Sequence, residues 1–130
     1  MGNICTINSE EIKDTDMKIS HNTLQQIISA VREMYLEQYK NNLKKIYLYG
    51  SYARGDSDDS SDIDITAIVE GDRRELQDKL KAIWDDAADL GYENDIIISP
   101  SVIPYKEFEE YKDILPYYMN ILKEGIEVHG

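Results

Sequence analysis

The chain contains little cysteine and comparatively few basic residues. Cys5 is the only cysteine among 130 residues, which excludes an intrachain disulfide and a zinc site built from several cysteines. The 14 Lys and Arg face 26 Asp and Glu, for a formal net charge of -12. Such a balance argues against general binding to a nucleic-acid backbone, which needs clustered basic residues. It suits a ligand that arrives with its own cation, or a basic protein partner.

Long hydrophobic runs are also missing. No apolar stretch approaches the roughly 18 residues that a membrane helix requires, and the start lacks the basic and then apolar segments of a signal peptide. We therefore expect a cytoplasmic protein that makes no membrane contact and binds no nucleic acid directly.

The length fits one domain. Residues 1–19 are polar and lack a clear period, so we interpret them as an N-terminal arm and residues 20–130 as a single domain. Helical periodicity, capping residues and β-branched runs predict an α/β chain in the order αβαβαβαα, in which the second helix is short. The expected strands cover residues 45–49, 62–69, 93–99 and, as a last short strand, 126–129; the expected helices cover 20–41 with Ser20 or Asn22 as cap, 72–91 with Gly91 just past its end, and two more that begin at Pro104 and Pro116.

The stretch YLYGSYARGDSDDSSDIDI, residues 47–65, carries five aspartates. Asp62 and Asp64 share one face of a strand at period two, roughly 7 Å apart along the chain. Two carboxylates on one face repel each other unless a cation lies between them, and Mg²⁺ binds carboxylate oxygens readily. The three earlier aspartates precede the strand and are interpreted as a solvated tether: Asp56, Asp58 and Asp59.

Gly50 and Ser51 end the strand before this acidic segment. A strand that turns into a helix at Ser51 leaves backbone N–H groups free to hold a phosphate, together with the Ser51 hydroxyl. Arg54 lies one turn further and can donate to the same anion. Phosphate donors beside metal-binding carboxylates are what a metal-bound nucleotide needs.

Two other phosphate and metal motifs fail on this stretch. A P-loop would require lysine where Asp56 stands. An EF-hand that begins at Asp56 would require glycine at Ser61 and glutamate at Ala67.

Gly50-Ser51, ten intervening residues and then Asp62-Ile63-Asp64 resemble the signature of the DNA polymerase β-type nucleotidyltransferase superfamily. The fuller segment GSYARGDSDDSSDID is similar to its small prokaryotic branch, the minimal nucleotidyltransferases. The resemblance implies the nucleotidyltransferase fold, a small mixed β-sheet flanked by helices, over residues 20–128. It also implies a third carboxylate on a later strand, which Asp95 in YENDIIIS matches, with Glu93 as the fallback.

The family's chemistry supplies an expected mechanism. Asp62, Asp64 and Asp95 would hold two Mg²⁺ ions, while Gly50, Ser51 and Arg54 bind the phosphates of a nucleoside triphosphate, by analogy ATP. Asp95 would also act as general base. Attack by an acceptor hydroxyl would transfer a nucleoside monophosphate and release pyrophosphate.

Three functions, which differ in the acceptor, are consistent with the sequence. Minimal nucleotidyltransferases are often paired with a helical HEPN-type ribonuclease toxin, so the resemblance implies an antitoxin that attaches AMP to a tyrosine of that toxin. The alternatives are a small-molecule enzyme of the aminoglycoside-modifying type, for which a homo-oligomer could form the cleft, and an antitoxin that acts by binding alone. The retained carboxylates argue against the last.

Overall fold

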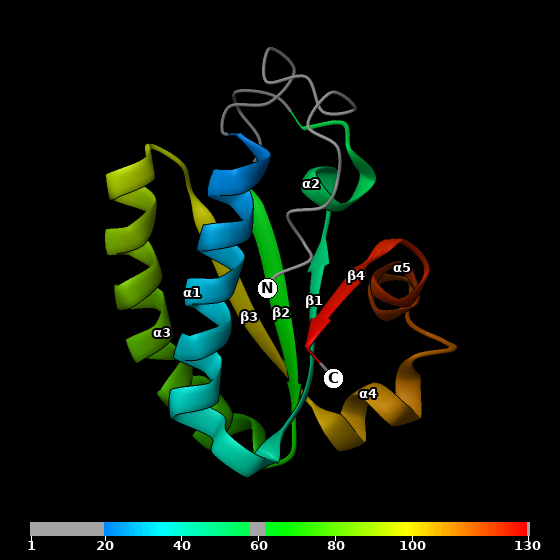
Figure 1. Cartoon of the computed structure of the whole chain (residues 1–130). Coiled ribbons are helices and arrows are strands. Elements are labelled where there is room, and N and C mark those ends of the chain that lie inside the picture. Colours follow the sequence, from blue (N-terminus) through cyan, green and yellow to red (C-terminus); the bar gives the residue numbers. More distant parts are fainter. Residues whose placement is uncertain (1–19, 58–61, 130) are drawn as a thin grey trace.

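The computed structural model describes residues 20–57 and 62–129. The predicted arm, residues 1–19, lies outside the described residues, as do Asp58 and Asp59 of the predicted tether. The described part forms a sheet with helices on both faces (Figure 1). None of its helices is long and apolar enough to cross a lipid bilayer.

The sheet is small and mixed, as the sequence predicts. Its four strands stand in the order β3-β2-β1-β4. The two central strands pair antiparallel, β4 pairs antiparallel with β1, and β3 pairs parallel with β2. The strands are β1 (Leu43–Tyr49), β2 (Ile63–Val69), β3 (Ile98–Pro104) and β4 (Ile126–His129).

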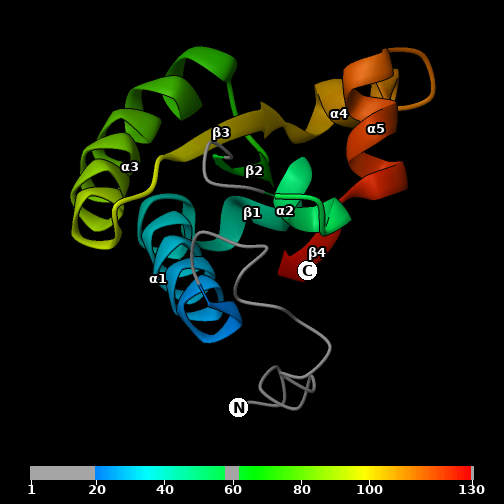
Figure 2. The same ribbon diagram turned by 90° about the horizontal axis from the view of Figure 1, so that it is seen from above.

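Two pairs of helices cover the two faces of this sheet (Figure 2). The long helices α1 (His21–Tyr39) and α3 (Arg73–Asn94) pack on one face, and α4 (Tyr105–Tyr111) and α5 (Pro116–Glu124) pack on the other. The single turns η4 (Lys40–Asn42) and α2 (Ser51–Arg54) flank β1. The predicted order of elements is confirmed.

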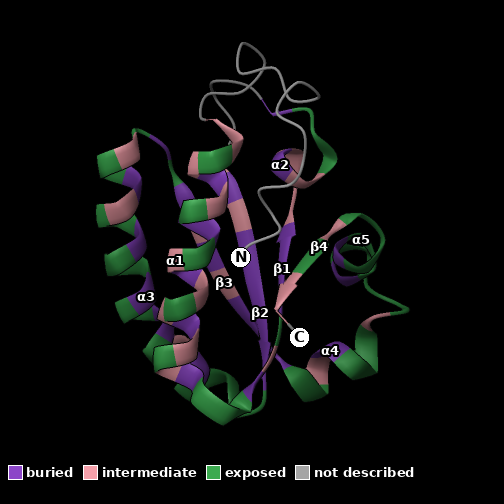
Figure 3. Cartoon of the chain, in the orientation of Figure 1, coloured by how far each residue is buried: buried purple, intermediate pink, exposed green. Residues whose placement is uncertain are grey.

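Side-chain alternation along β2 divides its residues between two environments. Ile63, Ile65 and Ala67 are fully buried in the larger core beneath α1 and α3. Ile68 belongs to the smaller core under α4 and α5. Figure 3 shows the buried central strands against the exposed outer surface of α3. Because Asp64 alternates with Ile63 and Ile65, it faces the side that α4 and α5 cover only in part.

Helix α1 begins and docks through two polar side chains. Of the two predicted caps, Ser20 is the one used, and its Oγ accepts a hydrogen bond of 3.1 Å from the Thr23 amide. Tyr35 is fully buried, and its hydroxyl donates to the Ser101 carbonyl at 2.8 Å while accepting from the Ser101 amide at 3.2 Å. This pair of bonds ties α1 to the edge strand β3.

The predicted third strand exists, but its predicted bounds, residues 93–99, are wrong. Helix α3 continues through Glu93 to Asn94, and β3 begins only at Ile98. Gly91 does not end the helix but lies buried within it, where a Cβ would stand 2.4 Å from the Ile96 carbonyl oxygen. The Ile96 amide donates to the Gly91 carbonyl at 2.9 Å, so glycine here permits the chain to turn back tightly against the helix.

The end of β3 differs for a second reason. The predicted strand ended at Ser99, whereas β3 continues through Pro100, a residue without a donor for the ladder, to Pro104. Within the described residues β3 pairs only with β2, and an edge strand tolerates proline where its amide would point away from the sheet. Pro100 is therefore a fully buried strand residue.

We predict that Gly91→Ala destabilises the fold by about 1–3 kcal/mol, the usual cost of an overpacked position. The added Cβ would collide with the Ile96 carbonyl, a backbone atom that cannot move without shifting the start of β3. Urea unfolding monitored by circular dichroism measures the change. Asp89→Ala, on the exposed surface of the same helix, serves as control and should be neutral or slightly stabilising because alanine favours helix.

Candidate functional site

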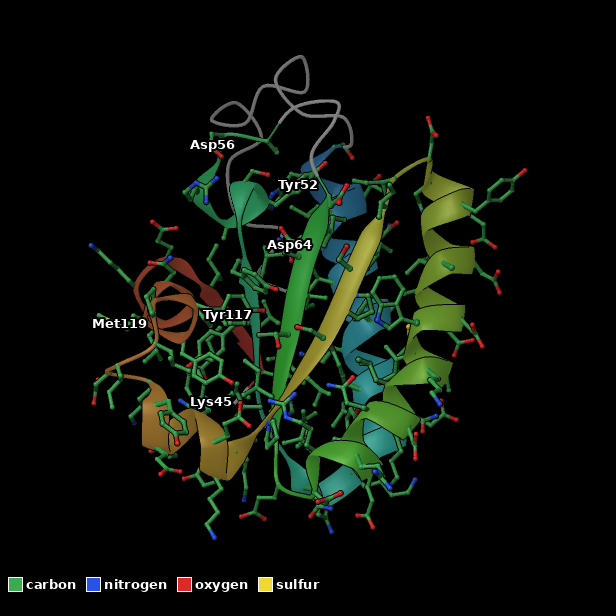
Figure 4. All side chains as sticks on the ribbon, turned by 180° about the vertical axis from the view of Figure 1, so that it is seen from behind. Lys45, Tyr52, Asp56, Asp64, Tyr117 and Met119 are labelled. Carbon is green, nitrogen blue, oxygen red and sulfur yellow. The ribbon has the colours of Figure 1, made fainter. Side chains whose placement is uncertain are left out.

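The candidate site lies where β1 ends and β2 begins. Antiparallel pairing sets Tyr49, the last residue of β1, directly across from Asp64. Asp62 precedes β2 by one residue and is half-buried like Asp64. Figure 4 shows Asp64 toward this end of β2, with Tyr52 of α2 and Tyr117 of α5 on neighbouring elements. The sheet thus brings the turn after β1 to the two aspartates.

Gly50 joins the turn to the carboxylate. A Cβ at this position would lie 2.5 Å from Asp64 Oδ2, and the backbone adopts φ of 80°. Both observations require glycine, because a side chain would be strained and would collide with the carboxylate. The Gly50 carbonyl then accepts from the Ala53 and Arg54 amides at 3.1 and 3.0 Å, which starts α2.

Helix α2 is a single turn of four residues, Ser51–Arg54. The helix dipole expected at Ser51 is correspondingly small, since the aligned peptide dipoles sum over few residues. Phosphate binding here would depend on the backbone amides of the turn and the half-buried Ser51 side chain.

The electrostatics of the aspartate pair favour a cation. Burial raises the pKa of Asp64, the negative charge of Asp62 raises it further, and the positive charge of Arg54 lowers it. Ionised Asp64 is thus held in an environment that penalises its charge. A divalent cation bound by both carboxylates would remove that penalty.

Arg54 is engaged with other carboxylates. Its Nε lies 3.2 Å from Asp56 Oδ2, and its Nη1 lies 3.5 Å from Glu124 Oε1 at the end of α5. Asp56, predicted to be part of a solvated tether, is therefore an exposed ion-pair partner. A phosphate would have to draw the guanidinium away from these two partners, which is feasible because exposed ion pairs are weak.

Asp95 does not lie on a strand. It caps the C-terminus of α3 in the left-handed conformation, with φ of 56° and ψ of 47°, and it is exposed. Helix α3 covers the sheet face opposite to Asp64. Its fallback Glu93 is an exposed residue of α3.

On the sheet itself, the residue of β3 in register with Asp64 is Ser99. Within residues 20–57 and 62–129, no group of three or more His, Cys, Asp or Glu is placed to hold a metal ion. The structure therefore gathers Gly50, Asp62, Asp64 and Arg54 into one site, and it does not bring Asp95 to them.

Hydroxyl groups next to Asp64 form a part of the site that the sequence analysis missed. The hydroxyls of Tyr49 and Tyr117 share a hydrogen bond of 2.9 Å. Burial raises the pKa of Tyr49, as does the bond to Tyr117. Thr66 follows Asp64 on the same face and is fully buried. Period-two alternation along β1 and β2 could have indicated that Tyr49 and Thr66 share the face of Asp64. The position of Tyr117 depends on the docking of α5, which the sequence does not show.

The turn at Gly50 and the aspartate pair lie within a region that matches a known protein family. The family model described as nucleotidyltransferase domain matches residues 24–128. The chain belongs to this family. The predicted nucleotidyltransferase class and fold are thereby confirmed.

Two relatives of this nucleotidyltransferase-domain chain come from Methanocaldococcus jannaschii, and both are named as candidate protein adenylyltransferases. The first is 40% identical over 63 residues, which cover 48% of this chain and 62% of the relative. The second is 31% identical over 88 residues, which cover 68% of this chain and 80% of the relative.

Solved structures with a related fold include a crystal structure of a toxin–antitoxin with AMP-PNP, at 19% identity and a TM-score of 0.48, over 84% of this chain and 72% of the other. Another is the complex of a tri-AMPylated Shewanella oneidensis HEPN toxin with an MNT antitoxin, at 16% identity and a TM-score of 0.46, over 82% and 71%. Likenesses this distant carry no argument about function.

We predict that Asp64→Asn stabilises the metal-free protein at neutral pH, by roughly 0.5–2 kcal/mol, the scale on which site residues trade stability for function. Because the pKa of Asp64 is raised in the folded state, the folded state binds the proton more tightly than the unfolded state does. The penalty is absent below the ordinary Asp pKa, grows as pH rises through the folded pKa, and is full above it.

Thermal unfolding in EDTA from pH 3 to pH 8 measures this effect. The gap between wild type and variant should open as pH rises. Equal stability of the two proteins at pH 8 would contradict the electrostatic account of the pair.

We also predict that Asp95→Gly stabilises the fold by up to about 1 kcal/mol, because glycine adopts the left-handed helix cap without steric cost. Chemical denaturation of the two proteins measures the difference. Asp95→Ala is the matched control and should be less stable than Asp95→Gly, since alanine retains the Cβ that disfavours this conformation.

Proposed function

We propose that this chain is a metal-dependent nucleotidyltransferase that moves AMP from ATP to a hydroxyl group of a protein. The observation that carries the proposal is the backbone of Gly50 closing on the Asp64 carboxylate, with Asp62 beside it. This arrangement unites a phosphate-binding turn and a cation-binding pair. It stands in a chain that belongs to the nucleotidyltransferase domain family.

The described residues fit a divalent cation. Burial, and then the charge of Asp62, raise the pKa of the Asp64 carboxylate. Mg²⁺ is commonly bound through one or two carboxylates together with substrate phosphates. When bound, such an ion would neutralise charge on the phosphates and withdraw electrons from the reacting phosphorus.

The remaining chemistry falls to residues of this chain. The amides of the turn and the Ser51 hydroxyl would donate to phosphate oxygens, and Arg54 would exchange its two carboxylate partners for phosphate. The acceptor oxygen would bond to the α-phosphorus as the bond to pyrophosphate breaks, and its proton would pass to a base. Asp95 as that base stays a prediction, since the structure places it at the end of α3.

The nature of the acceptor is inferred from the relatives and the surface. The relative that this chain covers to 80% is named as a candidate protein adenylyltransferase. Helix α5, which contacts the site, and the segment before it also expose apolar side chains, a feature typical of protein-binding surfaces. These are Ile114, Leu115, Tyr117, Met119 and Leu122.

We propose a helical HEPN-type ribonuclease toxin as the partner and one of its tyrosines as the acceptor. The similarity of GSYARGDSDDSSDID to the minimal nucleotidyltransferases supports this choice. The net charge of -12 would favour encounter with a basic partner surface. In this function the chain acts as an antitoxin that modifies its toxin.

The test is transfer of label from α-³²P-ATP in the presence of Mg²⁺ and a co-encoded HEPN-type protein. We expect label on a tyrosine of that protein and a loss of about 10³-fold or more in rate for Asp62→Ala and Asp64→Asn, because each removes a ligand of the reacting phosphates' cation. Asp89→Asn, an exposed aspartate of α3, is the matched control and should transfer at the wild-type rate.

Three outcomes distinguish protein modification, small-molecule modification and neutralisation by binding alone. Label on the partner that disappears in Asp64→Asn supports the proposal. Label that appears only on an added aminoglycoside favours the small-molecule reading. If the unlabelled partner is inhibited equally by wild type and Asp64→Asn, the chain neutralises by binding alone and the proposal fails.

A further inference from the structure

We propose that this chain holds one divalent cation through its own side chains, and that Ser99 occupies the sheet position from which a carboxylate would complete a second cation site. The inference rests on the proposed function, because it concerns the same pair of aspartates. It departs from the two-ion, three-carboxylate arrangement predicted from the sequence.

Strand register identifies the position. Strands β2 and β3 run parallel, with Asp64 in register with Ser99 and Thr66 with Ser101. Residues in register on adjacent strands point to the same face, with the strands about 4.8 Å apart. Ser99 is half-buried. Of all positions on β3, this one presents its side chain most directly to Asp64.

The opposite neighbour of Asp64 carries no carboxylate either. On β1 the residue across from Asp64 is Tyr49, whose hydroxyl is bonded to Tyr117. Asp64 therefore stands between a tyrosine and a serine in the sheet. Both can donate hydrogen bonds to a ligand, but neither supplies a negative charge for a second cation.

One acidic side chain of each helix on this face is shown to be engaged. Glu107 of α4 bonds to Arg73 at 2.6 Å and accepts a hydrogen bond from Tyr118, which lowers the pKa of Glu107. Glu124 of α5 pairs with Arg54 at 3.5 Å. Glu124, the acid that reaches Arg54 beside the aspartate pair, is therefore held by a cation of the chain itself.

Asp95 is held away by the tight turn that follows α3. The amide of Asp95 donates to the Tyr92 carbonyl at 3.3 Å, and the next amide, of Ile96, donates to Gly91 at 2.9 Å. Bringing the carboxylate to the other face of the sheet would break these bonds and the packing of Gly91.

Cation chemistry then limits the number of ions. Sites with two ions hold them roughly 3.5–4 Å apart and need bridging and terminal ligands for both. Two carboxylates satisfy one Mg²⁺ whose other positions are filled by water or phosphate. We therefore expect the described residues to hold one cation in the absence of nucleotide.

The experiment counts Mn²⁺ bound to the nucleotide-free full chain by electron paramagnetic resonance titration. Wild type should bind one Mn²⁺. Ser99→Asp should bind two, because the new carboxylate faces Asp64 in register, whereas Ser99→Asn, of the same size without the charge, should bind one. Asp95→Asn should also leave the count at one, and thermal unfolding of each variant verifies its fold.

A second variant that adds a carboxylate provides the test if Ser99→Asp fails to fold. Ile97 comes directly before β3, and its carbonyl accepts from the Ile63 amide, next to Asp62 and Asp64, at 2.9 Å. Because Ile97 is 62% exposed, Ile97→Asp should be tolerated and should likewise raise the count to two. Two ions in wild type, or the loss of an ion in Asp95→Asn, would overturn the inference while leaving the proposed transfer reaction standing. Absence of any bound ion in wild type, with Mg²⁺-independent transfer, would overturn both.

Discussion

The close contact between the backbone of Gly50 and the carboxylate of Asp64 is the constraint on which the site depends. Antiparallel pairing brings the end of β1 against the start of β2, and the chain must leave β1 without a side chain because a Cβ would lie 2.5 Å from Asp64 Oδ2. The same glycine supplies the carbonyl from which α2 starts. One residue thus fixes where phosphate donors stand relative to the carboxylates.

The fold compensates for an aspartate pair that disfavours folding. Burial and the charge of Asp62 raise the pKa of Asp64, yet the alternate residues of the same strand, Ile63 and Ile65, are fully buried. Burial of an isoleucine contributes about 1.5–3 kcal/mol to folding. The buried isoleucines on one face of β2 therefore more than offset the free-energy cost of the charged aspartates on the other face. Strand alternation therefore lets seven residues, Ile63–Val69, carry both the core and the candidate cation site.

The parts that could be predicted from the sequence depend on local rules. Period two placed Asp62 and Asp64 on one face, the helix expected from residue 72 begins there with Asp72 as its cap, and Gly50 stands at a turn. The position of Asp95 could not be predicted locally. Glycine after a periodic segment usually indicates the end of a helix, but Gly91 lies inside α3 and makes room for the Ile96 carbonyl. Pro100 is tolerated within β3 because β3 is an edge strand of the described sheet. Both facts depend on contacts between distant segments.

Within residues 20–57 and 62–129, polar contacts tie the two helices on the site face to neighbouring elements. Helix α5 approaches the site through the Tyr49–Tyr117 hydrogen bond and the Arg54–Glu124 ion pair, and α4 is linked to α3 through Arg73 and Glu107. Of these links, the Arg54–Glu124 pair engages an acid beside the site. Arg73 and Glu107 follow the ends of β2 and β3, away from Asp62 and Asp64 at the start of β2. A nucleotide entering the site must then compete for Arg54 against Asp56 and Glu124. Because Glu124 ends α5, occupancy of the site and the docking of α5 are physically coupled through one guanidinium.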